Sequence, residues 1–325
     1  MKKQKENRRK KILIPLFFSS FLLMTTTFAW FSANRMVSID SLNVHVQTDG
    51  GLEVSTNAID WKQVVTVQDI MGAREKYAGS VNQLPYQMNP VSSGGNISDG
   101  KLELFVGNAT NSVDDFILVA DRSIETESFG EDSEGNFIAF DVFFRVTSSK
   151  ELYLDGSSKV EYTGEANPGI ENATRIAFIT EGSSADNPNV SQGLNNGLSS
   201  IIWEPNYDVH TEYGVSHARD VYGLTTSISG ASRLSYDGVV AVVPSDLNIP
   251  ISSANASTYP GLFKNVNIGI ETSKNGGTNQ KIADLLPSVT KMRIYMWIEG
   301  QDVDCEDNAS YGDITFDLKF TVNPS

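Results

Sequence analysis

Apolar and polar positions alternate along much of this chain, which is the pattern of β-strands with one buried face. The clearest example lies near the C-terminus, where Ile294, Met296 and Ile298 are separated by single residues of a different kind. The stretch from Ile314 to Phe320 repeats the pattern, with an apolar residue at every second position. Both stretches predict half-buried antiparallel strands.

Further apolar segments of similar length occur upstream and predict more strands. They lie at 101–106, 115–120, 137–148, 151–155, 174–180, 200–205, 238–244 and 265–272. Gly, Asn and Ser dominate the intervening segments 89–101, 181–200 and 272–280, which are predicted to be loops. A helical pattern is indicated at 68–78. The chain is therefore expected to be all-β: an antiparallel β-sandwich, jelly-roll-like, with long loop insertions.

Another alternation runs from Val37 to Val46 and changes its phase by one residue. Val37 and Ile39 share one parity, whereas Leu42 and the apolar residues after it share the other. The change falls at Asp40–Ser41, where we expect a β-bulge or a bend.

The residues that follow predict the next two elements. Turn-forming residues occupy 48–51, so residues 52–56 are expected to pair back onto the first strand as a hairpin. Residues 61–70 predict a further strand or a sheet edge.

The beginning of the chain has the features of an export signal. Seven Lys or Arg residues and one Glu occupy positions 1–11, and positions 12–31 carry no charge. Thr27 and Ala29 supply the small residues of a cleavage site, so cleavage after Ala29 is expected. The alternative is an uncleaved hydrophobic helix that anchors the chain in a membrane. The expected division is a signal peptide at 1–29, an N-terminal extension at 30–41 and a β-sandwich domain at 42–325.

Charge and cysteine content narrow the partners. The formal net charge of the chain is −15, and removal of the basic leader would leave about −21. Such an acidic surface repels nucleic acid and anionic lipid, so contact with a membrane is expected only through the N-terminal segment. Cys305 is the single cysteine, which excludes an internal disulfide. We interpret it as a buried thiol, with a cross-link between two chains as the alternative.

The densest acidic stretch of the chain lies at 299–307. Its alternate carboxylates Asp302, Asp304 and Glu306 are candidate Ca²⁺ ligands, because Ca²⁺ binds six to eight oxygen atoms. The stretch lacks the spacing and the central glycine of an EF-hand, so the default interpretation is a solvated acidic turn. No other metal or cofactor is expected.

The sequence contains three histidines but no recognisable catalytic motif. His45 lies in a strand pattern, whereas His210 and His217 lie seven residues apart among acidic residues. Neither an HExxH nor a G-x-S-x-G context surrounds them, so they are interpreted as parts of a polar loop rather than as metal ligands or catalytic groups. The chain is therefore not expected to be an enzyme. A hydrolase is kept as a third hypothesis, because a site carried by loops leaves no motif.

The junction FAWFSANRMVSIDSLNVHV, at 28–46, resembles the start of TasA/camelysin-type proteins of Gram-positive bacteria, which carry a SipW-type signal peptide. The shared order is a small residue, an aromatic pair, a polar turn and a strand. The later stretches TRIAFI, IIWEPN, YMWIEGQDVDC and ITFDLKF look like a set of secreted clostridial-type proteins with the same kind of signal.

The TasA side of the resemblance implies a jelly-roll subunit that polymerises into an extracellular fibre or biofilm matrix. In such fibres the mature N-terminal segment inserts as a strand into the next subunit, which implies Trp30, Phe31, Met36, Val37 and Ile39 as self-assembly residues. Its partners would be copies of itself and, during export, a signal peptidase. The alternative for 30–46 is an ordinary first strand of its own sandwich.

The leading expectation is thus a secreted, cell-surface-associated structural protein without catalytic activity. The second hypothesis is a cell-surface adhesin or binding module that uses the long loops and Ca²⁺. Polymer formation by the mature chain separates the first hypothesis from the second, and titration with Ca²⁺ and glycans tests the second.

Overall fold

The computed structural model describes residues 37–46, 51–111, 116–127, 133–163, 169–216, 239–240, 249–250, 264–265, 268–300, 302, 304–305 and 313–322. The predicted signal peptide with Ala29 lies outside these residues, as do Trp30, Phe31, Met36 and Glu306. Among the described residues, no helix combines the length and the apolar character that crossing a bilayer requires.

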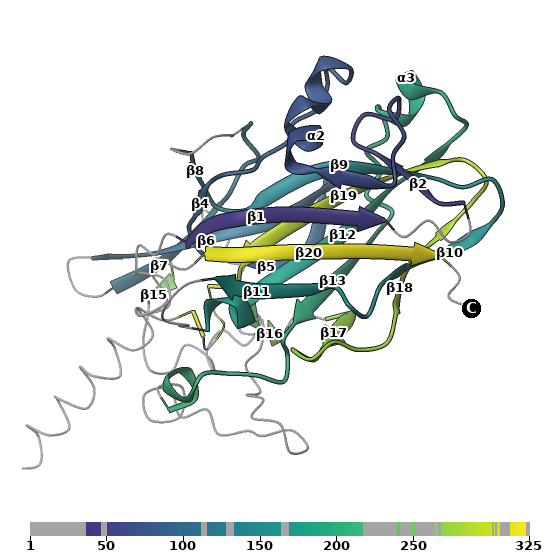
Figure 1. Ribbon diagram of the computed structural model, residues 1–325. Helices are drawn as coiled ribbons and strands as arrows, with labels where there is room; N and C mark the ends of the chain where they lie inside the picture. The colour runs from purple at the N-terminus through teal and green to yellow at the C-terminus, as the bar shows by residue number, and fades with distance from the viewer. Residues whose placement is uncertain are drawn as a thin grey trace, which may run out of the picture.

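Within the described residues, two large sheets dominate the fold (Figure 1). The first has the order β18 (Gln280–Leu285), β10 (Lys150–Leu154), β20 (Asp313–Val322), β1 (Val37–Val46), β4 (Gln87–Met88), β8 (Glu134–Gly135), with β11 (Lys159–Thr163) on β20 and β3 (Val64–Thr66) on β1. The second has the order β17 (Ile270–Thr272), β13 (Ser199–Pro205), β12 (Thr174–Ser184), β19 (Val289–Ile298), β9 (Ile138–Arg145), β2 (Glu53–Ser55).

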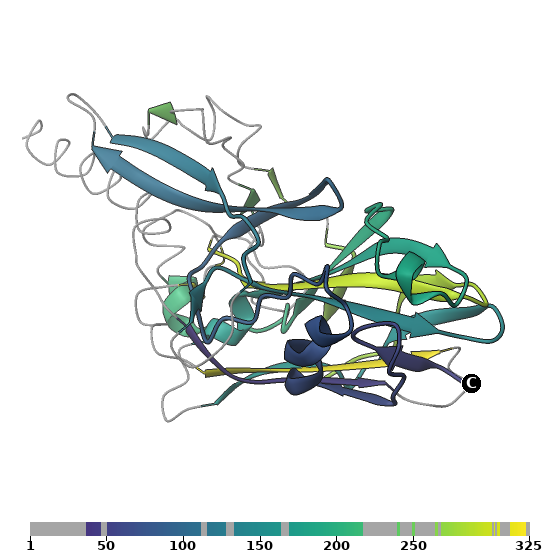
Figure 2. The same ribbon diagram turned by 90° about the horizontal axis from the view of Figure 1, so that it is seen from above.

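Two smaller sheets and four short helices complete the described elements. The smaller sheets are β15 (Ile249–Pro250), β7 (Phe116–Arg122), β6 (Lys101–Asn111), β5 (Ser92–Ser98) in that order, and β14 (Val239–Val240) with β16 (Lys264–Asn265). The helices are α2 (Val67–Gly72), η1 (Ala73–Glu75), η2 (Ile170–Ala173) and α3 (Pro188–Ser191). The long β6–β7 hairpin extends away from the two large sheets (Figure 2).

The two large sheets lie one over the other and enclose the main hydrophobic core (Figure 2). Phe144 of β9 and Phe178 of β12 meet Phe320 of β20 at ring centroid distances of 5.3 and 5.8 Å. All three rings are almost completely buried. The predicted all-β, sandwich-like architecture is confirmed.

Strand β19 is buried on both faces, although the sequence pattern predicted one solvated face. Each of its ten residues is buried. Ile294, Met296 and Ile298 face the core between the sheets, as the alternation implied. Tyr295 and Trp297 lie in a second core that includes residues of β6 and β12, so a further layer covers the face that was expected to be solvated.

Strand β1 belongs to its own chain's first sheet. It runs parallel to β20, with Ser38 opposite Asp313 and Ser41 opposite Thr315. The register therefore shifts by one residue between Ser38 and Ser41, which confirms the predicted bulge. The predicted boundary between extension and domain, after residue 41, falls inside this strand.

Three local predictions have different outcomes. The expected hairpin at 48–56 is wrong, because β2 pairs with β9 of the second sheet and the chain changes sheets there. The segment 89–101 is not purely a loop, since β5 forms within it and pairs with β6. The helix predicted at 68–78 is confirmed as α2 and η1, and Thr66 caps α2 through a capping box with Asp69.

Candidate functional site

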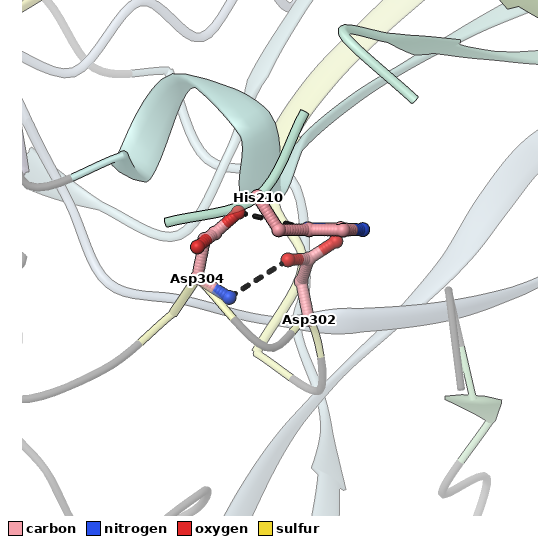
Figure 3. Close-up of side chains that lie close together, drawn as sticks. All are labelled: His210, Asp302 and Asp304. Atoms are coloured by element: carbon pink, nitrogen blue, oxygen red, sulfur yellow. Dashed lines mark hydrogen bonds and ion pairs between the residues drawn. The ribbon is translucent and has the colours of Figure 1, made fainter. Parts of the chain in front are cut away.

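The residues after β19 fold back over the start of β12 and carry acidic side chains into the protein. The amide of Glu299 donates to the carbonyl of Ala173 at 2.7 Å, and the amide of Asp302 donates to the carbonyl of Glu299 at 3.1 Å. This turn brings Asp302 and Asp304 to His210, which follows β13 in the chain. Figure 3 shows the imidazole lying beside both carboxylates. We call His210, Asp302 and Asp304 the His210 cluster.

Asp304 is the most heavily hydrogen-bonded member of the His210 cluster. Its Oδ2 lies 2.9 Å from Nδ1 of His210 and accepts from Nδ2 of Asn172 at 3.2 Å. Its Oδ1 accepts from the amide and the hydroxyl of Thr211, at 2.9 and 2.7 Å. Gly169 packs against the same group, with φ +84° and no room for a Cβ beside Thr211.

Asp302 connects the cluster to a buried arginine. Its Oδ2 accepts from Nη2 of Arg175 at 2.7 Å, and the same Nη2 lies 3.0 Å from Oε1 of Glu204. Its Oδ1 accepts from the amide of Asp304 at 2.9 Å. The cluster is thus held by η2, β12, β13 and the turn after β19, which lie far apart in the sequence.

The interpretation of this stretch as a solvated acidic turn is wrong for the described residues. The side chains of Asp302 and Asp304 are 0% exposed, and that of His210 is 1% exposed. Burial raises the pKa of Asp304, and the contact with His210 opposes this rise. His210 therefore belongs to a buried polar site rather than to a surface loop. His217 lies outside the described residues, and His45 is part of β1.

The ligand atoms of the three residues lie within 4.8 Å of one another, which is close enough to share one metal ion. The described set contains one imidazole nitrogen and carboxylate oxygens. Ca²⁺ prefers a shell made entirely of oxygen, whereas Zn²⁺ and similar ions accept mixed nitrogen and oxygen ligands.

A second group of buried charges lies on the face of the second sheet that points away from the main core. Asp141 of β9 accepts from Nη1 of Arg293 at 2.7 Å and from the hydroxyl of Tyr77 at 3.0 Å, and it lies 3.2 Å from Nζ of Lys291. Nε of Arg293 also lies 3.0 Å from Glu125. We call these five residues the Asp141 network.

The Asp141 network forms the floor of a pocket of about 470 Å³. Residues 77–81 and 192–195 form its walls, together with Lys101. Lys291 donates to the carbonyl of Leu194 at 2.8 Å and so ties one wall to the sheet. Because the charges of the floor compensate one another, they stabilise this wall as well as line the pocket.

Sequence reasoning missed the Asp141 network, although it left a signal. Asp141 interrupts the apolar run of β9, and Lys291 and Arg293 lie two positions apart, hence on one face of β19. A charged residue inside an apolar strand requires a partner when the strand is buried, so these residues could have been matched. The three tryptophans considered as a carbohydrate platform were interpreted as packing residues, and Trp203 and Trp297 are buried in the cores.

A scan against protein-family models, a search of curated proteins and a search of solved structures each found no match to this chain. The function is therefore argued from the sequence and from the geometry.

Proposed function

We propose that this chain is a secreted structural subunit of an extracellular fibre or matrix, and that it polymerises by donating its N-terminal strand to the next subunit. The proposal includes export through the N-terminal signal, a place outside the cell and the absence of catalysis. The observation that carries it is the position of β1 in the first sheet.

β1 is joined to the rest of the described fold only at its C-terminal end. It pairs with β20 along most of its length, and on its other side it meets only the short strands β3 and β4. A terminal strand of this kind can leave its place without unthreading any other element. The same strand of a second copy can then make the same main-chain hydrogen bonds, so exchange between copies conserves the pairing.

Loss of β1 would leave one edge of β20 without a partner. An unpaired edge binds another strand readily, and the strand of a neighbouring copy fits by construction. The acidic charge of the chain suits a soluble precursor that assembles only after export. The TasA-type junction at 28–46 supports the same conclusion from the sequence side.

A pair of cysteines can report whose β1 lies against β20. Asn43 and Asp317 are direct neighbours in the parallel register, at a spacing that a disulfide can bridge. The variant Asn43→Cys/Asp317→Cys, made with Cys305→Ser, is oxidised before and after assembly. The matched control is Glu151→Cys/Asp284→Cys, which joins β10 to β18 of the same sheet.

Oxidation of the polymer should give a ladder of disulfide-linked chains for the β1–β20 pair and single chains for the control pair. Oxidation of the dilute precursor should lock β1 in its own chain and prevent polymer formation. The proposal fails if mature protein stays monomeric at high concentration, or if locked chains polymerise as well as unlocked ones. Electron microscopy and non-reducing gels give the two readouts.

The pocket above the Asp141 network favours a second candidate, a cell-surface binding module. Its floor offers fixed cations and hydroxyl groups, which suit a small polar ligand. A glycan and carboxylate panel, read by thermal shift on the wild-type chain, tests this function. It would be rejected if no member of the panel raises the melting temperature.

A further inference from the structure

We propose that the His210 cluster binds one divalent transition-metal ion of the Zn²⁺ class, with His210, Asp302 and Asp304 as ligands and with Asn172 as a fourth. This inference is independent of strand donation. It differs from the Ca²⁺ site considered for Asp302, Asp304 and Glu306, because it uses an imidazole and no residue beyond Asp304.

The first support is the spacing of the donor atoms. Nδ1 of His210 and Oδ2 of Asp304 lie 2.9 Å apart, and all three ligand atoms lie within 4.8 Å of one another. Ligands on a single ion with bonds of about 2.0–2.2 Å lie roughly 3 to 4 Å apart. A metal ion can therefore take the place of the proton shared by His210 and Asp304 with small movements of the side chains.

The second support comes from Asn172, which is 3% exposed. Its Nδ2 contacts Asp304, whereas its Oδ1 has no hydrogen-bond partner among the described residues. A buried carbonyl oxygen without a donor is costly and requires an explanation. Rotation of the carboxamide by half a turn exchanges the two atoms and places the oxygen 3.2 Å from Oδ2 of Asp304, where it can join a metal shell.

The third support is the balance of buried charge. Arg175 is shared by Glu204 and Asp302, so this group of three has one negative charge in excess. Asp304 adds a second negative charge, and its described partner is His210. The nearby carboxylate of Glu171 is compensated separately by Lys274, at 2.9 Å. A divalent ion bound to neutral His210 brings the described group to zero net charge, which a buried site strongly favours.

The outer contacts are those expected around a metal ligand. Arg175 and Thr211 hold the outer oxygens of the two carboxylates, and such contacts orient ligands and strengthen binding. Gly169 closes the group where a larger residue would clash with Thr211. Coordination by a nitrogen and three oxygens selects Zn²⁺, Mn²⁺ or Co²⁺ over Ca²⁺.

The test measures metal uptake by the full chain. Metal-free protein is dialysed against Zn²⁺, Mn²⁺, Co²⁺ or Ca²⁺, and bound metal is counted by mass spectrometry of the elements. We expect about one Zn²⁺ ion per chain, a visible Co²⁺ absorption band that Zn²⁺ removes, and a higher melting temperature with Zn²⁺. The variants Asp304→Asn and His210→Gln should weaken Zn²⁺ binding at least roughly tenfold.

The matched control is Asp186→Asn, an exposed carboxylate paired with Arg145, which should bind Zn²⁺ like the wild type. The Co²⁺ spectrum of the wild-type chain needs no variant, so the test stands even if a substitution prevents folding. The inference is overturned if the wild-type chain takes up no transition metal, if Ca²⁺ binds in preference to Zn²⁺, or if folded Asp304→Asn and His210→Gln chains retain full affinity.

The metal site and the strand donation fail separately. The chain locked by Asn43→Cys/Asp317→Cys cannot donate β1, yet it should bind Zn²⁺ with unchanged affinity. Loss of metal binding in the locked chain would contradict the separation of the two sites.

Discussion

The substitution Asp141→Asn should lower the free energy of unfolding by about 3 kcal/mol, because it leaves two buried cations without their shared counter-charge. The side chains of Asp141, Lys291 and Arg293 are 3%, 7% and 6% exposed, so solvent screens these charges little. Removing one partner of a buried ion pair costs about 3–5 kcal/mol. The lower end applies here, since Arg293 keeps Glu125 and the new amide can still accept hydrogen bonds.

Urea denaturation followed by tryptophan fluorescence measures the effect, since Trp203 and Trp297 are buried in the two cores. With a slope of about 3 kcal/mol per molar urea, the midpoint should fall by about 1 M. Asp60→Asn is the matched control, because Asp60 is paired with Lys76 at the surface and should leave the midpoint unchanged. A decrease below about 1 kcal/mol for Asp141→Asn would refute the reasoning.

The same variant should show a defined pH dependence. Burial alone would raise the pKa of Asp141, but Arg293 and Lys291 hold it below the usual value of 3.8. The carboxylate therefore contributes its stability above pH 3.8, and this contribution is lost as the pH falls through the folded pKa. The difference between wild type and variant should narrow at acidic pH. Adding Lys291→Met to the variant should recover part of the loss.

Three further substitutions test the packing, the cap and a buried acid, each by urea denaturation. Phe320→Ala should cost about 3–5 kcal/mol, because the ring is buried between the two sheets. Thr66→Ala should cost about 1 kcal/mol by removing the cap of α2. Burial raises the pKa of Glu181 above 4.5, so ionisation destabilises the fold, and Glu181→Gln should gain stability relative to wild type as the pH rises through this range.

Each of the three has an outcome that contradicts it. A loss below about 1 kcal/mol for Phe320→Ala would mean that the sheets do not pack through this ring. An unchanged midpoint for Thr66→Ala would exclude the cap. A difference between Glu181→Gln and wild type that is constant with pH would show that the carboxyl titrates at its ordinary value.

Alternation in the sequence was sufficient to predict the all-β fold, because each strand must bury one face. It could not predict what covers the other face. The alternation around Tyr295 and Trp297 looks half-buried, yet residues of β6 and β12 pack there. Pairing partners are equally invisible, since residues 52–56 satisfy either a hairpin or the observed pairing of β2 with β9.

The candidate site was only partly accessible from the sequence. Asp302 and Asp304 were recognised by their spacing, but their burial depends on Arg175 and His210, which come from other elements. Charge density along a chain does not reveal whether a partner arrives from elsewhere in the fold, so the solvated interpretation followed from local information alone.

The parallel pairing of β1 with β20 also sets an order for folding. β1 is made near the beginning of synthesis and β20 almost at its end, which at roughly 5–20 residues per second separates them by tens of seconds. The first sheet cannot close until the last strand has emerged, so the fold carries a high cost of long-range contact formation. The newborn N-terminal strand therefore waits without its main neighbour while the rest of the chain is made.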